Sequence, residues 1–406
     1  MRLSQSFIKT LRSAPKDETA RGAQYLSRAG YIYKELAGVY DYLPLGLRVL
    51  DNIKTIVREE LNRIGAEECL MSTLQNPEPW IKTDRWDIEK MDIWFRTQLA
   101  AGGELGLGPT HEEPFTEMLR NYVSSYKDLP FAVYQIQTKF RNELRAKSGI
   151  MRGREFLMKD MYSFCATTED HDKFYHEAEK AYMRIYDRLG IGNDTYETFA
   201  SGGVFSKYSH EFQTICEVGE DNIYYNKDKS VVLNEEVLID EVMNDLGVKR
   251  DELEMTKAAE VGNIFTLGTK FSAPLGLEFT DQAGERKPVL MGCYGIGISR
   301  VMGVIAEKMC DDKGLVWPEN IAPYKHYLIG IGDEGMKKAE ELYRGREEEV
   351  LFDDRDLRPG EKFTDAELMG IPYRVVVSDK TLADGKAEVT DRKTGETKLV
   401  ALTEIF

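Results

Sequence analysis

The 406-residue sequence is poor in cysteine and in long apolar runs, and both shortages exclude classes of protein. Its five cysteines form no C-x-x-C pair, so neither a disulfide framework nor a cysteine-rich zinc site is expected. No apolar run approaches the roughly 20 residues of a membrane-spanning helix. The first twenty residues contain no uninterrupted apolar core of signal-peptide length. These shortages predict a cytoplasmic protein with no membrane partner and no metal held by protein ligands alone.

Basic residues are outnumbered, with 54 Lys and Arg against 70 Asp and Glu, so the formal net charge is −16 at pH 7. A strongly acidic molecule repels phosphate over its whole surface, so indiscriminate binding to nucleic acid, and binding to DNA, is not expected. One stretch goes against this trend, because residues 139–159 contain seven Lys or Arg against two Glu. The acidity of the whole chain therefore leaves room for a local basic site at this stretch.

A standard nucleotide loop is missing as well, although the stretch GCYGIGISR (Gly292–Arg300) is rich in glycine. The dinucleotide pattern G-x-G-x-x-G fails because Arg300 occupies its last position. The P-loop pattern fails because Ile298 stands where the phosphate-binding Lys is needed. Three interpretations stay open: a degenerate phosphate loop, a structural glycine cluster, or a site that uses Arg300 differently.

Apolar spacing predicts the main elements of the first three quarters of the chain. Leucine, isoleucine and valine recur at helical spacing over residues 46–65. Residues rich in aromatic and β-branched side chains predict two strands, 131–143 and 152–166, joined as an antiparallel hairpin with a basic loop. A helix is expected over 166–191, with Thr168 as its N-cap. Residues 218–255 are acidic and irregular in pattern, and we expect a short connecting segment there.

The last quarter of the chain has a different pattern. Two prolines, Pro318 and Pro323, interrupt residues 313–325, which are therefore predicted to be a linker. Beyond the linker, short strand and helix patterns alternate and a final β pair follows. Alternating units of this kind predict a small α/β domain with a largely parallel sheet.

Six separate blocks carry the functional information. In order they are LGPTHEE (107–113), LPFAVYQIQTKFRNE (129–143), RGREFLMKDMYSF (152–164), SHEF (209–212), NIFTLGTKFS (263–272) and MGCYGIGISR (291–300). With the long helix before them and Arg141, Arg152 and Arg300 within them, they resemble prolyl-tRNA synthetases of the bacterial type, which are class II aminoacyl-tRNA synthetases. Residues 353–380 are similar to the anticodon-binding domain of that family, so the resemblance covers nearly the whole chain.

The resemblance implies an α+β fold with two domains. A class II catalytic domain, an antiparallel sheet flanked by helices, is expected over 1–320, and a small α/β anticodon-binding domain over 324–406. Motif 1 at about 46–79 implies a homodimer interface. Motifs 2 and 3 are expected at about 131–164 and 291–306. The short segment at 218–255 stands where many bacterial members carry an editing domain.

The resemblance also implies a reaction. L-Proline would react with ATP to give prolyl-adenylate and pyrophosphate, Mg²⁺ would accompany ATP, and the prolyl group would pass to the 3′ end of tRNA(Pro). Two anions must meet in the first step, so charge neutralisation and positioning dominate. Arginine suits this task because its planar fork matches oxyanions, and the catalytic residues are expected to be Arg141 and Arg300.

The same resemblance assigns binding residues. The residues expected to bind ATP are Arg141, Glu143, Arg152, Phe156, Glu260 and Arg300. Those expected to bind proline are Thr110, Glu112, Arg141, Asp160, His210 and Asn263. Those expected to bind tRNA are Arg145, Lys147 and Arg154 in the basic loop, and Arg355, Arg358, Lys362 and Glu367 in the C-terminal domain.

Two departures from the family pattern keep alternatives open. Asn263 stands where the family usually has His, and Ser72 where it usually has Pro after the methionine of motif 1. A class II enzyme with another specificity, such as threonine or serine, is one alternative. A non-catalytic tRNA-binding or accessory subunit is the other, although such proteins tend to lose the arginines that this chain keeps.

The short segment in place of an editing domain gives a first prediction. A pocket shaped for proline excludes the smaller alanine weakly, because the lost apolar contact is worth only about 1–3 kcal/mol. We expect that the purified chain alone does not hydrolyse Ala-tRNA(Pro), measured as deacylation over time. Hydrolysis faster than the rate without protein would contradict this.

Overall fold

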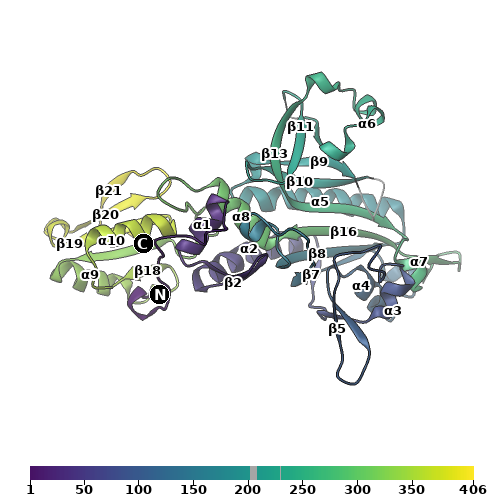
Figure 1. The fold of residues 1–406 in the computed structure, drawn as a ribbon, viewed down its shortest axis with the longest axis horizontal. Coiled ribbons are helices and arrows are strands. Elements are labelled where there is room, and N and C mark those ends of the chain that lie inside the picture. Colours follow the sequence, from purple (N-terminus) through teal and green to yellow (C-terminus); the bar gives the residue numbers. More distant parts are fainter. Residues whose placement is uncertain (202–207, 229) are drawn as a thin grey trace. The chain divides into compact units, whose positions relative to one another are not determined.

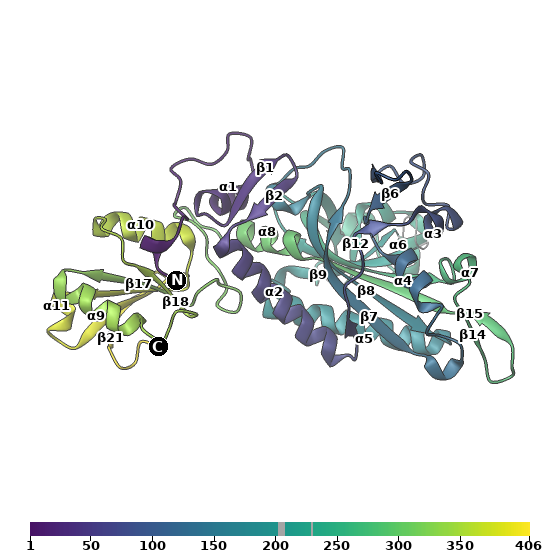
Figure 2. The ribbon, with the colours of Figure 1, turned by 90° about the horizontal axis from the view of Figure 1, so that it is seen from below.

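The computed structural model describes residues 1–201, 208–228 and 230–406, which form two compact units (Figures 1 and 2). One unit contains residues 37–39 and 54–301. The other contains residues 1–36, 40–53 and 302–406, so the boundary expected at 320–324 lies inside it. Among the described helices, none combines the length and the apolar character that crossing a membrane requires.

A nine-stranded sheet forms the centre of the unit around residues 54–301, with the described strands in the order β10-β9-β12-β11-β13-β16-β8-β7-β3. Its middle is antiparallel, and the predicted hairpin is confirmed as the pair β7 and β8. The strands are β3 (Glu67–Glu68), β7 (Phe131–Phe140), β8 (Glu155–Cys165), β9 (Thr195–Ser201), β10 (Tyr208–Ile215), β11 (Asp221–Tyr225), β12 (Val232–Asn234), β13 (Glu254–Gly268) and β16 (Leu290–Gly297).

Helix α5 (Thr168–Arg188) lies against β8 and β16 on one face of this sheet (Figure 1). The predicted helix is confirmed, but its cap is Thr167, whose hydroxyl accepts a hydrogen bond from the Asp170 amide at 3.1 Å. The predicted cap, Thr168, is the first residue of the helix. The end of α2 (Pro44–Arg63), which confirms the helix predicted over 46–65, is tied to α5 because Arg184 donates to the buried Glu60 at 2.7 Å.

The opposite face of the sheet is defined by one row of paired residues. Glu211, Asn263, Gly295, Asp160 and Gln135 are successive partners across five strands. Side chains in a strand alternate between faces, so members of one row share a face.

The chain neighbours of this row identify the two faces. Lys159 donates to the hydroxyl of Tyr182 on α5, and the ring of Phe212 contacts the same tyrosine. Since Lys159 and Phe212 face α5, the row that contains Asp160 and Glu211 faces away from it. That free face carries the candidate site.

Smaller elements surround the free face. A three-stranded sheet is formed by β4 (Leu74–Gln75), β5 (Phe95–Gln98) and β6 (Glu104–Leu107), beside α3 (Pro77–Lys82) and α4 (Glu112–Leu119). The hairpin β14 (Glu278–Thr280) and β15 (Arg286–Pro288) follows α7 (Ser272–Leu275), and α8 (Ile298–Lys308) follows β16.

The segment 218–255 is more regular than expected. It forms β11, β12 and the short helix α6 (Asp240–Asp245), and β11 pairs with β13 as part of the central sheet. A small core of its own contains Leu233, Val237, Val242 and Met243. The apolar residues of this core are separated by acidic residues, and each element is too short to show a helical or strand period in the sequence.

The unit that contains the C-terminal residues has the predicted strand and helix alternation. Strands β17 (His326–Ile331), β18 (Val350–Asp353) and β19 (Tyr373–Ser378) are parallel, and β20 (Lys386–Asp391) and β21 (Thr397–Ala401) add an antiparallel edge. Its helices are α9 (Asp333–Tyr343), α10 (Pro359–Met369) and α11 (Asp379–Leu382). The same unit contains α1 (Arg21–Arg28) and β1 (Ile32–Leu36). In the sequence, β2 (Val39–Tyr42) follows β1 and precedes α2. The predicted linker contains neither helix nor strand, and Trp317 within it packs on Tyr31 with ring centroids 5.3 Å apart.

Candidate functional site

Two adjoining cavities open on the free face of the central sheet. The first has a volume of about 580 Å³ and the second of about 720 Å³. All the residues predicted to bind ATP line the first cavity, as does Asn263. The second cavity shares most of them and adds Glu220 and Asp221. The structure therefore gathers residues from the segment between β7 and β8, from β8 and β13, and from α8.

Arg141 is the most enclosed cation of these cavities. It follows β7, donates from Nε to the Pro109 carbonyl at 3.3 Å, and its guanidinium lies 5.3 Å from the centre of the Phe156 ring. Burial, and the neighbouring charge of Arg300, lower the pKa of the Arg141 guanidinium. Because arginine stays protonated in proteins, such a lowering means that the charge would be stabilised by an anion placed beside it.

The glycine-rich stretch packs closely against neighbouring side chains. Gly295 and Gly297 line the first cavity, and a Cβ at Gly297 would lie 3.1 Å from the Cβ of Arg300. Gly292 faces the other way, where a Cβ would lie 2.5 Å from the Tyr294 hydroxyl. Arg300, in the first turn of α8, donates to the Met151 and Glu260 carbonyls, both at 2.8 Å. Of the three interpretations, a glycine cluster that brings Arg300 to the cavity fits the geometry.

Arg152 is held by acidic side chains. It donates to Glu143 Oε2 at 2.7 Å and to Glu220 Oε2 at 2.6 Å, and Lys147 Nζ lies 3.3 Å from the other oxygen of Glu220. Carboxylates thus occupy the positions on Arg152 that an anionic ligand would need.

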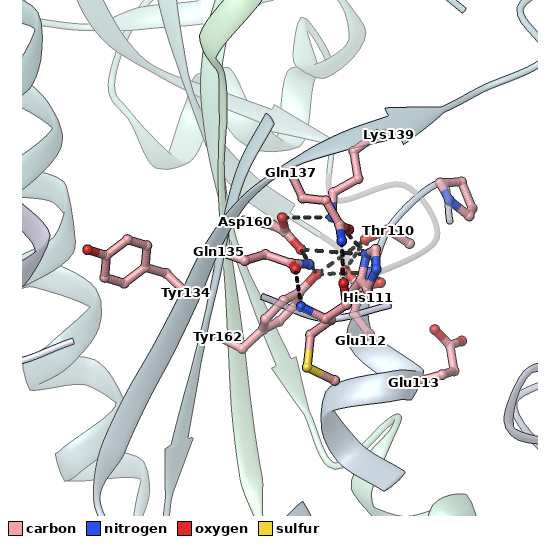
Figure 3. A network of polar contacts seen from close by, with 12 residues as sticks. Thr110, His111, Glu112, Glu113, Tyr134, Gln135, Gln137, Lys139, Asp160 and Tyr162 are labelled. Atoms are coloured by element: carbon pink, nitrogen blue, oxygen red, sulfur yellow. Dashed lines mark hydrogen bonds and ion pairs between the residues drawn. The ribbon is translucent and has the colours of Figure 1, made fainter. Parts of the chain in front are cut away.

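Thr110, Glu112 and Asp160 lie in a buried polar network beside the cavities, without lining them (Figure 3). The Thr110 hydroxyl donates to Glu112 at 2.7 Å. Asp160 Oδ1 pairs with Lys139 Nζ at 2.8 Å, while its Oδ2 accepts from Gln135 and Tyr162 at 3.0 and 3.1 Å. Asp160 therefore has partners on both oxygens within the protein.

His111 belongs to the same network and is neutral. Its Nδ1 accepts from Lys139 Nζ at 2.7 Å, because an ammonium group can only donate. The ring proton therefore lies on Nε2, which donates to the Ser72 carbonyl at 3.0 Å. Burial and the charge of Lys139 lower the pKa of His111 to about 4. A neutral, fully paired ring of this kind does not favour proton transfer at neutral pH. No such role was predicted for His111 from the sequence.

Arg85 and Glu113 were missed by the sequence analysis. Arg85 Nη1 lies 3.3 Å from Glu112 Oε2 and 3.0 Å from Glu113 Oε1, and both carboxylates are fully buried. Glu113 also accepts from the Thr83 hydroxyl at 2.7 Å. Arg85 lies outside the six blocks, and no spacing rule marks it.

His210 does not reach the cavities. It lies on the face covered by α5, where its Nδ1 contacts the Tyr175 hydroxyl at 2.7 Å. Glu179, Glu197 and His210 each place one possible metal-ligand atom within 4.8 Å of the others. Among the described residues this is the one group of three His, Cys, Asp or Glu with such spacing. Glu211, the next residue, occupies the cavity face. The period-two alternation of a strand is the signal that would have favoured Glu211.

The residues predicted to bind tRNA differ in their surroundings. Arg145 and Lys147 are exposed on the loop between β7 and β8, but Arg154 donates to the Glu143 carbonyl at 3.0 Å. In the C-terminal domain, Arg358 is exposed and Glu367 pairs with Lys313 at 3.1 Å.

The other two C-terminal residues face inward. Arg355 bridges Asp353 at 2.7 Å and Asp365 at 2.8 Å. Lys362 is only 3% exposed and donates to the Asp353 carbonyl at 3.0 Å. Their charges are satisfied inside the domain, which a sequence pattern of charges cannot reveal.

The chain is similar to known proteins over its whole length. Residues 95–309 match the tRNA synthetase class II core domain (G, H, P, S and T), and residues 325–406 match an anticodon binding domain. A proline–tRNA ligase of Wolbachia pipientis wMel is 38% identical over 421 residues, covering 100% of this chain and 98% of the relative. That of Ehrlichia chaffeensis (strain ATCC CRL-10679 / Arkansas) is 38% identical over 425 residues, with 100% and 99% covered.

Two solved structures share the fold. The prolyl-tRNA synthetase of Cryptosporidium parvum, complexed with halofuginone and AMPPNP, superposes with a TM-score of 0.77 at 18% identity, covering 95% of this chain and 75% of that one. The Giardia lamblia prolyl-tRNA synthetase, in complex with prolyl-adenylate, gives a TM-score of 0.76 at 21% identity, with 94% and 74% covered. At these identities the similarity concerns the fold.

The pairing of Arg152 with Glu220 predicts competition with anionic ligands. In Glu220→Gln one of the two carboxylates on Arg152 becomes neutral, so the arginine is more available to phosphate oxygens. We expect tripolyphosphate to bind several-fold more tightly to this variant than to the unmodified protein, measured by titration calorimetry. Glu217→Gln, an exposed change in the same segment, is the control. Equal affinity in Glu220→Gln and the unmodified chain would contradict the competition.

Proposed function

This chain belongs to the proline–tRNA ligases, a family of class II aminoacyl-tRNA synthetases, and we propose that it forms prolyl-adenylate, with ATP in the two cavities and L-proline between them and the adjoining network of Thr110 and Glu112. One observation carries the proposal: Arg141 and Arg152, from the segment between β7 and β8, and Arg300, from α8, converge on one cavity. A carboxylate oxygen of proline attacks the α-phosphorus of ATP, and pyrophosphate leaves. A ribose hydroxyl of the terminal adenosine of tRNA(Pro) then attacks the prolyl carbonyl, and AMP leaves.

The arginines neutralise the anions that meet in the first step. Arg141 is the most enclosed, and it lies where a carboxylate and an α-phosphate can share its planar fork. Arg300 and Arg152 flank it and take the outer phosphates, once Glu220 yields its place on Arg152. Phe156 stacks on the adenine ring. It also helps to position Arg141, because the guanidinium lies over the Phe156 ring. Once Glu220 has left Arg152, positioned cations of this kind act without further reorganisation when charge develops.

Mg²⁺ is part of the proposal. Glu260 and Asp221 contribute carboxylate oxygens to the second cavity, and such hard oxygen donors, beside phosphates, are what Mg²⁺ prefers. Glu260 is the residue that would hold it, with Asp221 nearby. When bound, the ion would neutralise charge on the phosphates.

Proline is recognised by Thr110 and Glu112 in this proposal. A secondary ammonium offers two N–H donors, and a carboxylate beside a hydroxyl can accept both. Asn263 lines the adjoining cavity and takes the place of the usual histidine. Asp160 supports the site indirectly, because it holds the Tyr162 hydroxyl that accepts from the His111 amide at 3.1 Å. His210, on the other face, is left out.

The remaining expectations are also proposals. Arg145 and Lys147 contact the acceptor stem, and the C-terminal domain reads the anticodon of tRNA(Pro). A homodimer forms through residues 46–79, where Leu70 is 74% and Leu74 is 51% exposed. Exposed apolar side chains in one region favour an interface. The protein acts in the cytoplasm, on tRNA and not DNA, and lacks editing of Ala-tRNA(Pro).

Amino-acid-dependent exchange of pyrophosphate into ATP tests the function. We expect exchange with L-proline, lowered about 10²–10³-fold in Arg141→Ala and Arg300→Ala, because each removes a positioned cation. Arg286→Ala, which removes an exposed arginine of β15, is the control and should retain exchange.

The alternatives predict different outcomes. Exchange with threonine or serine but not proline would indicate another class II specificity. Absence of exchange with every amino acid, in a protein that still binds tRNA, would indicate an accessory subunit and contradict the proposal.

A further inference from the structure

The start of helix α4 places two carboxylates side by side in the interior. Glu112 and Glu113 are both 0% exposed. Figure 3 shows Glu112 turned toward the Thr110 network and Glu113 apart from it. Two adjacent buried carboxylates repel each other, and burial of their charge is costly unless a cation is close. The arginine that follows α3, Arg85, supplies that cation.

Arg85 is bound more closely to Glu113 than to Glu112. Its Nη1 lies 3.0 and 3.1 Å from the two oxygens of Glu113, but 3.3 Å from the nearer oxygen of Glu112. Thr83 adds a hydrogen bond to Glu113 at 2.7 Å. The guanidinium is fixed from two sides, since it lies 5.1 Å from the ring centres of both Trp80 and Phe271. Arg85 is therefore held in place as the partner of Glu113.

Glu112, in contrast, has mostly neutral partners. Its oxygens accept from the Thr110 hydroxyl at 2.7 Å and from the Cys293 thiol at 3.4 Å. The nearby Lys139 is paired with Asp160 at 2.8 Å. Two carboxylates with one guanidinium leave one negative charge, and the neutral donors place it on Glu112.

We propose that Glu113 sets the charge of the proline site: by binding Arg85 it leaves on Glu112 the one negative charge that the ammonium of the substrate neutralises. The inference rests on the proposed function, and it assigns a positioning role to two residues that do not touch the substrate. A neutral Glu113 would release Arg85 to Glu112, and the site would then carry no net charge.

A proton on Glu113 and an ammonium at Glu112 therefore exclude each other. Burial raises the pKa of Glu113 to about 7. The charge of Glu112 also raises this pKa, whereas the charge of Arg85 lowers it. Other cations also act on this pair. Lys270 is exposed, so water screens its charge, Lys139 is neutralised by Asp160, and Arg141 lies on the Glu112 side, toward the cavities. Proline stays cationic near neutral pH, so its binding favours the ionised form of Glu113 and releases a proton.

The KM for proline in pyrophosphate exchange should consequently fall as pH rises. With a group of pKa about 7 that must be ionised, the expected KM at pH 6 is about tenfold higher than at pH 8. The rate at saturating proline should not follow this change, because saturating substrate draws Glu113 into its ionised form. A KM for proline that is flat from pH 6 to pH 8 would overturn the inference.

Variants separate a charge effect from a structural one. Glu113→Gln is neutral at every pH, so its KM for proline should equal or exceed the pH 6 value of the unmodified protein and should not change with pH. Thr83→Val removes a hydrogen bond to the ionised carboxylate and should move the midpoint of the KM profile to higher pH. Glu117→Gln, on the exposed side of α4, should keep the original profile.

The outcomes distinguish the inference from the function. No exchange with proline at any pH would contradict the proposed function itself. Exchange with proline whose KM keeps the same pH dependence in Glu113→Gln would leave the function intact and overturn the role of Glu113. If Glu113→Gln fails to fold, the profiles of the unmodified protein and of Thr83→Val decide.

Discussion

The pairing of buried charges beneath the free face of the central sheet is the constraint on which the rest of the structure depends. Lys139 and Asp160 are both buried, 2.8 Å apart, and Arg85 joins the fully buried Glu112 and Glu113. Breaking such a pair leaves an uncompensated charge in the interior, at a cost of about 3–5 kcal/mol. The strands and loops that carry these residues are therefore held in one register.

That register determines what the cavities present. Because β7 carries Lys139, the chain reaches Arg141 two residues later, directly after the strand, where it lines both cavities. Because β8 carries Asp160, it delivers Phe156 to the cavity from the same side. The buried ion pairs stabilise the sheet. In the cavities, by contrast, Arg152 pairs with a carboxylate from a loop, that of Glu220. The Lys139–Asp160 pair is thus neutral within the protein, while Arg152 in the cavity is paired with carboxylates that a phosphate can replace.

Much of this arrangement could be predicted from local patterns. The hairpin of residues 131–165 follows from its β-branched and aromatic residues, and Arg300 was marked by its failure to fit two known loops. Strand alternation could also have placed Glu211, and not His210, toward the cavity. Arg85 could not be predicted, because its significance comes from a contact with residues 27 and 28 positions away. The inward orientation of Lys362 was likewise hidden, since burial of a charged residue depends on a carbonyl that the tertiary fold brings near.

The chain belongs to a family whose reaction needs one cation recognised and several anions neutralised, and its charges are divided accordingly. Carboxylates at residues 112 and 113 form one region, and arginines at 141, 152 and 300 form the other. In the function proposed here, proline bridges the two regions, with its ammonium at Glu112 and its carboxylate at Arg141. The buried network between them sets this polarity.

A crystal structure of the chain with a non-hydrolysable prolyl-adenylate analogue tests this polarity most directly. The ring nitrogen of proline should lie about 2.7–3.2 Å from Glu112, with the α-phosphate mimic at Arg141 and Arg85 still bound to Glu113. An analogue whose ring nitrogen contacts Asp160, or whose phosphate mimic lies away from Arg141, would contradict the division of charge proposed for this site.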